Sequence, residues 1–508
     1  MDAERAYDAV PYTSKPFPET HPDRMFLVAQ LVGLDPPPVH TARILELGCA
    51  SGGNLVPIAA RLPGTTCVGV DISGVQIRDG QARVAALGLT NCTLIHANLA
   101  DLEPLGPFDY VLVHGVWSWV PPAVQEAILG HLNVALADGG LATVSYNTYP
   151  GWYRRGMVRE MCRWHVRDLP TEPERVEQAR TLVAFLLSAL EGSTSHHAEA
   201  IRQEARLLQQ TDETYLTHGL LAEVNTPCWF HEMAERVQAA GLTIVGDADL
   251  STLLHDDLSA GARGALGGLD PGSVRHEQLA DLVRNRTFRR SILARAGARP
   301  CHPPRWTPVL DCTVSTLARQ VDRSTFVAFR GSRFTVRDPL LVAALGLLVA
   351  RRPQTVGFGD LLERACARVG RPPDGSAAAA LAQSLLALMA KRAVQLYPRD
   401  LGIVVAPGPR PVACPVIRER AAQGDAVPNL RHESFVLRTM DRHLVQLLDG
   451  TADTTALVHR LEALHASGAL TVEEGGAAIT GRGAFRAACR VGLTEWIDAM
   501  ARAGFLVG

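Results

Sequence analysis

Residues 44–54, ILELGCASGGN, limit the possible folds of this chain more than any other segment. Two apolar residues, Ile44 and Leu45, precede a turn with three glycines, and the apolar spacing of a helix begins at Leu55. This pattern predicts a strand, a tight turn and a helix, which together bring backbone N–H groups and a helix N-terminus close to a ligand. The spacing E-x-G-x-A-x-G differs from the dinucleotide fingerprint G-x-G-x-x-G, so no pyrophosphate is expected at this turn.

The next predicted strand ends in an acidic residue. The run TCVGVD ends at Asp71, about 20 residues after the glycine turn, where an acid can accept both hydroxyls of a ribose. Further strands are predicted at 93–97 and 108–114. An isolated glycine-rich turn is also typical of an ordinary βα connection. The acidic strand end and the additional strands favour instead an open α/β sheet that binds a cofactor containing a ribose.

Length and composition exclude several classes of protein. The 508 residues are too many for a single hydrophobic core, and the net charge of −2 predicts no overall attraction to nucleic acid or to an anionic membrane. The ten cysteines form no C-x-x-C pair, so neither a zinc site nor a disulfide framework is predicted, and we expect no other metal site. The chain opens without a signal-like segment, and its longest apolar run, 339–350, is about half of a membrane span. We therefore expect a soluble, cytoplasmic protein without a membrane partner.

The order of the predicted elements divides the chain into five parts. The first is rich in proline and aromatic residues, which predicts an extended arm packed over another part of the chain. The second holds the parallel strands, and helical spacing dominates the third before the last strands of the sheet. Three helices and a closing strand predict a winged-helix-like unit in the fourth part, and the fifth has a similar arrangement. The predicted boundaries are 1–40, 41–152, 153–300, 301–405 and 406–508.

The third part has two possible interpretations. Residues 153–220 are either a helical insertion above the sheet or a separate helical domain with no part in it. A strand at 242–246 and an antiparallel strand at 288–294 then return the chain to the sheet. We also predict that the strand before this region covers only 141–147, because Asp-Gly-Gly at 138–140 is a typical helix end.

Four segments together resemble bacterial protein lysine methyltransferases of the rickettsial type: PYTSKPFPETHPDR, ELGCASGGN, HGVWSWV and YNTYPGW. The resemblance implies a Rossmann-like class I methyltransferase sheet with a helical insertion or regulatory region, followed by winged-helix-like α+β domains. It also implies that S-adenosylmethionine is the cofactor and that the acceptor is the ε-amine of lysines on a protein, a surface protein in the best-known members. The motif [DNS]-P-P-[YF] of enzymes that methylate planar amines is absent, which argues against adenine or a glutamine amide as the acceptor.

The resemblance also suggests roles for individual residues. The glycine turn and Asp71 would hold the cofactor, with the N-terminal arm across it, and His114 would lie near its methionine end. For the acceptor, a desolvated pocket beside the positive cofactor lowers the pKa of a lysine amine, and aromatic walls hold a cation without a charge partner. The predicted cofactor residues are Tyr12, Glu46, Gly48, Ala50, Ser51, Gly52, Asn54, Asp71, Ile72, Asn98, Leu99 and His114. The predicted acceptor residues are Trp117, Tyr146, Asn147, Tyr149 and Trp152, with Trp119 beside them.

Two other functions are compatible with the same residues. A methyltransferase could act on a small molecule or a short peptide, by N- or O-methylation, and a closed pocket without a groove would favour that function. A non-catalytic regulator could bind nucleic acid through winged helices, but the arginines near 284–290 are more typical of a solvated or paired face. The acceptor, the number of methyl groups, the role of the C-terminal domains and the oligomeric state do not follow from the sequence.

Overall fold

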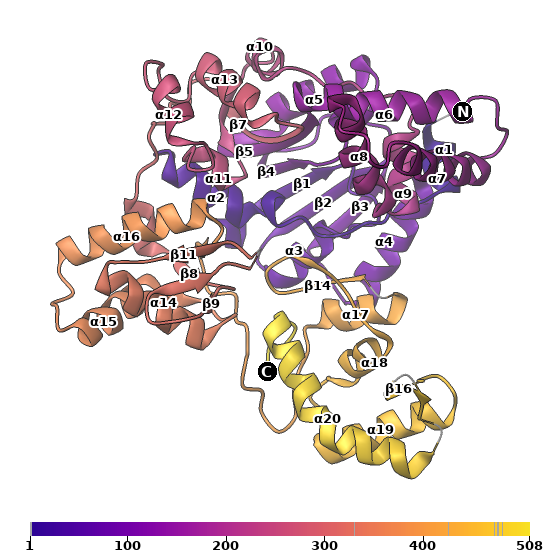
Figure 1. Cartoon of the computed structure of the whole chain (residues 1–508), viewed down its shortest axis with the longest axis vertical. Helices are drawn as coiled ribbons and strands as arrows, with labels where there is room; N and C mark the ends of the chain where they lie inside the picture. The colour runs from indigo at the N-terminus through magenta and orange to yellow at the C-terminus, as the bar shows by residue number, and fades with distance from the viewer. Residues whose placement is uncertain (1–2, 330, 425, 472, 475–476, 480) are drawn as a thin grey trace.

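The computed structural model describes residues 3–329, 331–424, 426–471, 473–474, 477–479 and 481–508. Its centre is a seven-stranded sheet with the order β3-β2-β1-β4-β5-β7-β6 (Figure 1). Neighbouring strands are parallel except at β7, which is antiparallel to both β5 and β6. The strands are β1 (Arg43–Leu47), β2 (Thr66–Asp71), β3 (Cys92–His96), β4 (Phe108–Val113), β5 (Leu136–Asn147), β6 (Leu242–Asp247) and β7 (Phe288–Arg295).

Successive residues of β1 point to opposite faces of the sheet, and each face has its own core. Ile44 belongs to a core with α2 (Pro22–Leu31), α3 (Leu55–Arg61) and α4 (Gly74–Ala86). Leu45 belongs to the opposite core, with α5 (Pro122–Ala135) and α10 (Phe230–Ala239). The layered α/β architecture predicted from the sequence is therefore confirmed.

The strand β5 is longer than predicted. It begins at Leu136, directly after α5, and includes the Asp-Gly-Gly segment that we interpreted as a helix end. Phe108 pairs with Leu136 and Tyr110 with Leu141, so the extra residues form an irregularity in the pairing with β4. Gly139 has a φ of 72°, a left-handed conformation that allows the chain to bulge without breaking the strand.

The N-terminal part is less extended than predicted. It contains helix α1 (Ala3–Ala9), the 3₁₀ turn η1 (Pro18–Thr20), helix α2 and the turn η2 (Val39–Thr41), so only the segment between α1 and η1 is an extended arm. Pro22 is the first residue of α2, a position where proline is well accommodated because that N–H has no helical partner.

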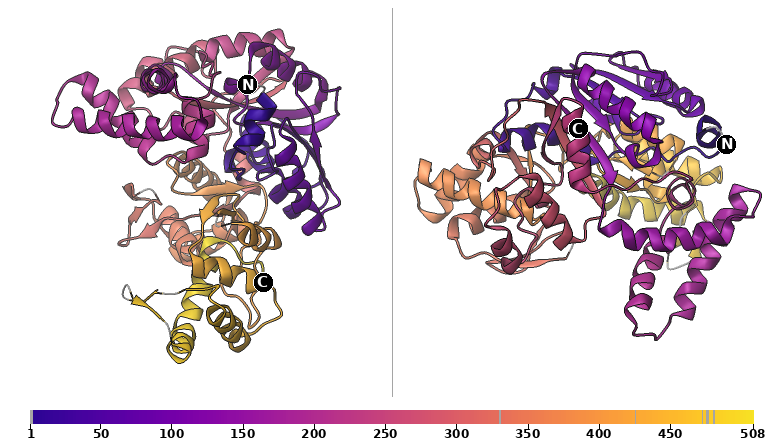
Figure 2. Two further views of the ribbon diagram at one scale, coloured as in Figure 1. Left: turned by 90° about the vertical axis from the view of Figure 1, so that its right-hand side faces the viewer. Right: turned by 90° about the horizontal axis from the view of Figure 1, so that it is seen from above.

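A helical segment follows β5 and projects from the body of the molecule (Figure 2). Its helices pack on one another around a small core of their own that includes Val158, Val183 and Ile201. The chain then returns to the sheet through α10 and β6, and after further helices through β7. The elements are α6 (Gly151–Val166), α7 (Glu172–Ala189), α8 (His196–Gln209), α9 (Glu213–Tyr215), the π-helical turn η4 (Leu216–Leu220), α11 (Leu250–Leu253), α12 (Ala260–Leu266) and α13 (Val274–Arg284).

The next unit shares its core with the sheet. Apolar residues such as Val314 and Leu396 belong to the same continuous cluster as Met25 and Ile44. The elements are η5 (Thr307–Asp311), β8 (Thr313–Ser315), β9 (Arg319–Gln320), β10 (Thr325–Val327), β11 (Arg333–Thr335), α14 (Pro339–Arg351), β12 (Val356–Gly357), α15 (Phe358–Val369), α16 (Gly375–Ala390) and β13 (Gln395–Tyr397).

The last unit has a separate core, which extends from Leu401 to Leu506. Because the core changes between Leu396 and Leu401, we propose that the boundary between the two C-terminal units lies there, close to the predicted position. In the part of the chain that the structure describes, no helix is both long and apolar enough to cross a membrane. The elements are α17 (Pro415–Gln423), β14 (Ala426–Pro428), β15 (Ser434–Val436), α18 (Thr439–Leu447), α19 (Thr454–Ala466), β16 (Glu473–Glu474), β17 (Ala477–Ala478) and α20 (Arg482–Ala503).

Candidate active site

The glycine turn brings backbone groups close to the ends of β1 and β2. Gly48 and Gly52 have φ angles of 78° and 71°, and Ala50 also has a positive φ of 48°. A Cβ on Gly48 would lie 2.3 Å from Val116 Cγ2, so this position has no room for a side chain. The Gly48 N–H donates to the Val70 carbonyl over 2.8 Å, which fixes the turn against β2.

Asp71, the last residue of β2, lies beside this turn. Its Oδ2 accepts a hydrogen bond from the Ala50 N–H at 2.7 Å, and its Oδ1 accepts one from the Ser73 N–H at 2.9 Å. Burial raises the pKa of Asp71, and the backbone donors act in the opposite direction. Each carboxylate oxygen can accept a further hydrogen bond, so Asp71 retains acceptor capacity for ligand hydroxyls.

Glu46, in β1, has one oxygen without a partner. Its Oε1 accepts a hydrogen bond from Asn54 Nδ2 at 2.8 Å, whereas Oε2 is buried and has no hydrogen-bond partner among the described residues. Burial raises the pKa of Glu46 to about 8, against the lowering effect of the Asn54 hydrogen bond. A buried carboxylate oxygen without a hydrogen-bond partner is unfavourable in free energy, and a cationic group of a ligand would supply the missing partner.

A cavity of about 510 Å³ lies at the carboxyl edge of the sheet, next to Glu46 and Asp71. This is the edge at which open α/β sheets bind ligands, and cofactor sites typically have volumes of roughly 300–1,000 Å³. The predicted site residues that line the cavity are Tyr12, Glu46, Gly48, Ala50, Asn54, Asp71, Ile72, Asn98, Leu99, His114 and Asn147.

The N-terminal segment and the helical insertion cover the cavity together. The Tyr7 ring stacks on His218 of the insertion with centroids 4.8 Å apart, and His218 Nε2 lies 2.5 Å from the Val10 carbonyl oxygen. Gln76 of α4 donates to the Tyr12 carbonyl over 3.0 Å. Because His218 also lines the cavity, the geometry favours the insertion over a separate helical domain.

A second part of the cavity wall is formed by five residues from four separate segments: Phe17, His114, Trp119, Asn147 and Phe288. The His114 ring lies 4.1 Å from the Phe17 ring and 6.0 Å from the Phe288 ring, measured between centroids. Asn147 Nδ2 donates to Asn225 Oδ1 at 2.9 Å, which leaves the Asn147 amide oxygen available as an acceptor. We propose that these five residues face the methyl acceptor, and we call them the acceptor end.

His114 is neutral at pH 7. Burial lowers its pKa to about 3, and the positive charges of Arg290 and Lys15 act in the same direction. Its Nδ1 is buried and has no hydrogen-bond partner among the described residues. A neutral imidazole can donate or accept a hydrogen bond here without adding a positive charge to the cavity.

Two residues predicted to contact the cofactor do not line the cavity. The Ser51 carbonyl accepts a hydrogen bond from Arg83 Nη1 at 2.5 Å, and the Gly52 N–H donates to the Cys49 carbonyl at 2.9 Å. The backbone groups of both residues bond within the protein and stabilise the turn, so these two residues are not placed to touch the cofactor.

Trp117 and Tyr146 also lie outside the cavity. Trp117 is fully buried, with the Arg236 guanidinium 4.7 Å from its ring centroid. Tyr146 is 1 % exposed, and its hydroxyl lies 2.9 Å from Ser291 Oγ on β7. Both belong to the core beneath α5 and α10. Successive residues of a strand point to opposite faces of the sheet, so Tyr146 points away from the face of its neighbour Asn147. Neither residue is therefore placed to contact an acceptor in the cavity.

The last two predicted acceptor residues lie beside the cavity but not on its wall. Tyr149 stacks on Tyr153 with centroids 4.3 Å apart, in an aromatic cluster with Trp229. Trp152 is 4 % exposed and lines a neighbouring cavity of about 380 Å³ under the insertion. Of the aromatic residues predicted for the acceptor, Trp119 lines the main cavity.

Several cavity residues were not predicted from the sequence. Phe288 could have been predicted as a cavity residue. It begins an antiparallel strand, and such a strand starts at the edge of the sheet where its parallel neighbours end. Phe17 was within the predicted arm but had no assigned role. His218 had no local signal, since it reaches the cavity only through the packing of the insertion.

One group of side chains outside the cavity has metal-ligand chemistry. His255 Nε2 lies 3.1 Å from Glu277 Oε1, and His276 is adjacent. Arg289 already pairs with Glu277 at 3.0 Å, and Arg284 Nη2 lies 2.9 Å from His255 Nδ1. The positive charges of these two guanidinium groups repel a metal cation, so we assign no metal to this group of side chains.

Comparison with known proteins agrees with this geometry. Family models match the chain at residues 45–142 (methyltransferase domain), 212–295 (predicted methyltransferase regulatory domain) and 409–505 (PKMT, C-terminal winged helix domain). An uncharacterised protein of Rickettsia prowazekii is 38% identical over 288 residues, which cover 56% of this chain and 52% of that protein. A second one is 38% identical over 234 residues, which cover 46% of this chain and 94% of that protein. The match therefore spans about half of the first relative and nearly all of the second.

The whole chain is also similar to a solved structure. PKMT2 from Rickettsia typhi, in complex with AdoHcy, has a TM-score of 0.86 and 25% sequence identity, with 98% of this chain and 100% of that chain covered. Another structure of PKMT2 has a TM-score of 0.88 at 24% identity, with the same coverage.

The fold and the cavity define a class I S-adenosylmethionine-dependent methyltransferase. Within that class, the chain belongs to the family that carries a methyltransferase regulatory domain and the PKMT C-terminal winged helix domain. Its methyl donor is S-adenosylmethionine, and the cavity fits that molecule. Asp71 has acceptors for the ribose hydroxyls, and the unpartnered Glu46 Oε2 suits the ammonium of the methionine part.

Proposed function

We propose that this protein transfers a methyl group from S-adenosylmethionine to the ε-amine of lysine side chains in a protein substrate. The family supports methyl transfer, and the acceptor end supports an amine as its target. PKMT2, the similar solved protein, was crystallised with AdoHcy, the demethylated form of this donor.

The proposal that the acceptor is a polypeptide rests on a groove beside the cavity. The groove has a volume of about 1170 Å³ and is lined by residues around β7 and by residues of the unit that contains β10 and β11. Phe288 lines both the groove and the cavity, so the two meet at the first residue of β7. A small acceptor requires only an enclosed pocket, whereas a folded or extended polypeptide requires an open surface next to the reacting atoms.

The charges in this groove favour an acidic stretch of substrate. It is lined by six cationic side chains and by three carboxylates, so its net charge is positive although the whole chain is slightly acidic. Arg284, Arg286 and Arg392 are paired with aspartates. The other three, Arg290, Arg333 and Lys391, have no carboxylate within 4.0 Å among the described residues.

The acceptor end addresses the main obstacle to lysine methylation, which is protonation of the amine. With an ordinary pKa of about 10.4, only about one amine in 2,500 is unprotonated at pH 7. A half-buried, aromatic wall without a carboxylate favours the neutral amine, because the charged form loses its hydration there. His114 is too weak a base to take the proton, so we assign it a positioning role with Asn147, whose amide oxygen can accept an amine N–H.

The other residues hold the reactants in line. The bound donor supplies a methyl group on a positively charged sulfur, which is already a good leaving group. Asp71 and Glu46 orient it through its ribose and ammonium, and Phe17 and Trp119 enclose the acceptor chain. Alignment of the free amine with the methyl carbon is then the main catalytic contribution of the protein.

Incubation of the protein with isotopically labelled S-adenosylmethionine and a bacterial lysate tests this function. Mass spectrometry should map the label to lysine side chains. Single-turnover rates at saturating donor should rise from pH 7 to about pH 9, as more amine loses its proton. Label on a carboxylate, a hydroxyl or only on small molecules would refute the proposal.

The groove can be tested separately with synthetic peptides that contain one lysine flanked by aspartates or by serines. The double substitution Arg333→Glu with Lys391→Glu should raise KM for the acidic peptide several-fold and change kcat little, because these side chains line the groove and not the cavity. Arg438→Glu, at a 93% exposed side chain of the last unit, is the matched control. Equal KM values for both peptides in the native protein would exclude this charge preference.

A further inference from the structure

The C-terminal unit contacts the turn that forms the cofactor site. The contacts come from the hairpin of β14 and β15 and from helix α17, and they join distant parts of the chain, since His432 and Asn54 are 378 residues apart in the sequence. At the centre of these contacts, His432 and Asn54 are both buried.

His432 makes the most direct of these contacts. It lies between β14 and β15, it is 7% exposed, and its Nε2 is 2.7 Å from Asn54 Oδ1. Its φ of 63° is left-handed, a conformation that costs a residue with a side chain free energy and that persists where the surrounding structure requires it. Burial lowers the pKa of His432, so the ring is neutral and donates from Nε2 to the amide oxygen.

Asn54 connects this histidine to the cofactor site. It occupies the N-cap position of α3, where an asparagine side chain usually accepts a hydrogen bond from the helix backbone, but no such cap bond is present. Its Oδ1 instead also accepts from the Phe17 N–H at 3.0 Å, and its Nδ2 donates to Glu46 Oε1 at 2.8 Å. One side chain thus joins the N-terminal arm, the C-terminal hairpin and the carboxylate of the cavity.

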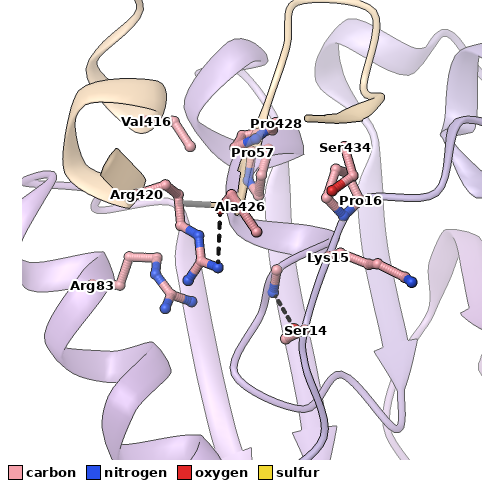
Figure 3. Close-up of a pocket in the computed structure, with 11 residues that line it drawn as sticks. Ser14, Lys15, Pro16, Pro57, Arg83, Val416, Arg420, Ala426, Pro428 and Ser434 are labelled. Carbon is pink, nitrogen blue, oxygen red and sulfur yellow. Dashed lines mark hydrogen bonds between the residues drawn. The ribbon is translucent and has the colours of Figure 1, made fainter. Parts of the chain in front are cut away.

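Two further contacts brace the same turn. Arg83, whose Nη1 donates to the Ser51 carbonyl, lies 3.3 Å from Glu419 of α17, and both side chains are almost fully buried. Figure 3 shows the hairpin residues Pro428 and Ser434 beside Pro57 and Pro16, next to Ser14. Ser14 Oγ accepts a hydrogen bond from the Gly53 N–H at 2.7 Å, so the arm is held between the hairpin and the turn.

We propose that the C-terminal unit is part of the cofactor-binding machinery, with His432 as a positioning residue that acts through Asn54. In its docked position the hairpin orients the Asn54 amide. This amide in turn holds Glu46 in place for the methyl donor and holds the N-terminal arm through the Phe17 N–H. Docking and donor binding are then coupled, and each strengthens the other by the same factor.

Calorimetric titration of S-adenosylhomocysteine into the full-length protein tests this coupling. His432→Ala should weaken binding about fivefold or more, the loss that follows removal of one partner from a buried hydrogen bond. His432→Gln, whose side-chain amide can donate from a similar position, should restore part of the affinity. Val436→Ala, at a 75% exposed position of the same hairpin, is the matched control and should bind normally.

A double-mutant cycle distinguishes positioning from general destabilisation. In an Asn54→Ala background, His432→Ala should cause no additional loss of affinity, because its effect passes through that side chain. An equal additional loss in this background would overturn the proposal, as would binding by His432→Ala within twofold of the native protein.

Hydrogen exchange of the native protein gives a result even if a variant does not fold. Binding of S-adenosylhomocysteine should increase the protection of backbone amides in the segment that contains β14, His432 and β15. Unchanged exchange in that segment at saturating ligand would show that the hairpin and the donor site are independent. Because these tests use the demethylated donor alone, their outcome does not depend on the identity of the acceptor.

Discussion

The two ends of the cavity are built in different ways. The donor end comes mostly from one short stretch of chain, in which the turn after β1 and the acid at the end of β2 are linked by hydrogen bonds between backbone and side chain. The acceptor end comes from four segments that are distant in sequence and that meet only in the folded protein. A contiguous site depends on local backbone geometry, whereas a dispersed site depends on how whole elements pack. Substitutions at the two ends should therefore have separable effects.

Removal of the Asp71 carboxylate should have the largest effect. Asp71→Ala deletes a charge-assisted contact to the donor and the partners of two backbone N–H groups, so the affinity for S-adenosylhomocysteine should fall at least tenfold, about 1.5–3 kcal/mol. Titration calorimetry measures the loss, and circular dichroism checks the fold. Asp79→Ala, at an exposed position of α4, is the control. Unchanged affinity would remove Asp71 from the donor site.

The affinity for the donor should depend on pH through Glu46. Its pKa of about 8 means that the free protein holds this proton at pH 7, whereas a bound ammonium favours the carboxylate. Binding then releases a proton, so affinity should rise with pH between about 6 and 8 by up to tenfold per unit. Glu46→Gln should remove this slope, and a slope that persists in the variant must come from another group.

The same carboxyl should also affect folding. The raised pKa of Glu46 in the folded state means that the native protein binds this proton more tightly than the unfolded chain. The contribution of Glu46 to the free energy of unfolding is therefore greatest at low pH and decreases between about pH 4.5 and 8 in the absence of donor. Comparison of the native protein with Glu46→Gln in denaturant titrations isolates this contribution.

At the acceptor end, Trp119→Ala should slow methyl transfer several-fold and leave donor affinity within twofold. The indole forms part of the wall that encloses the acceptor chain. Its contact with the positive charge that develops on the amine nitrogen during transfer should contribute roughly 0.5–2 kcal/mol. Parallel measurements of single-turnover rate and donor affinity test this separation. A loss of both in equal proportion would mean that the two ends are not independent.

The smallest effect is expected at Tyr146. Its hydroxyl bonds to Ser291 in the core, so Tyr146→Phe should change transfer less than twofold while it lowers the free energy of unfolding by about 1 kcal/mol. Urea denaturation and the transfer rate together check this. A large loss of activity with little loss of stability would show that Tyr146 acts on the acceptor.

The difference between the donor end and the acceptor end also explains how much of the site could be predicted from the sequence. The parallel sheet, the turn and Asp71 could be predicted, because apolar periodicity and glycine spacing are local consequences of the backbone. The acceptor residues were harder to predict: Asn147 and Tyr146 are adjacent on β5, yet only Asn147 lines the cavity. His218 and His432 had no local signal of a role at the site, because only tertiary packing brings them to it.

The core shared by the sheet and the following unit affects how this protein can be made. Residues as late as Leu396 belong to the same core as α2, which lies on one face of the sheet, so this core stays incomplete on the ribosome until most of the chain has been synthesised. Folding in the order of synthesis therefore leaves part of its apolar surface exposed, and such surface is prone to aggregation. A chain that stops near residue 300 would retain that exposed surface permanently. Newly made protein should thus require protection from a chaperone until translation passes that point.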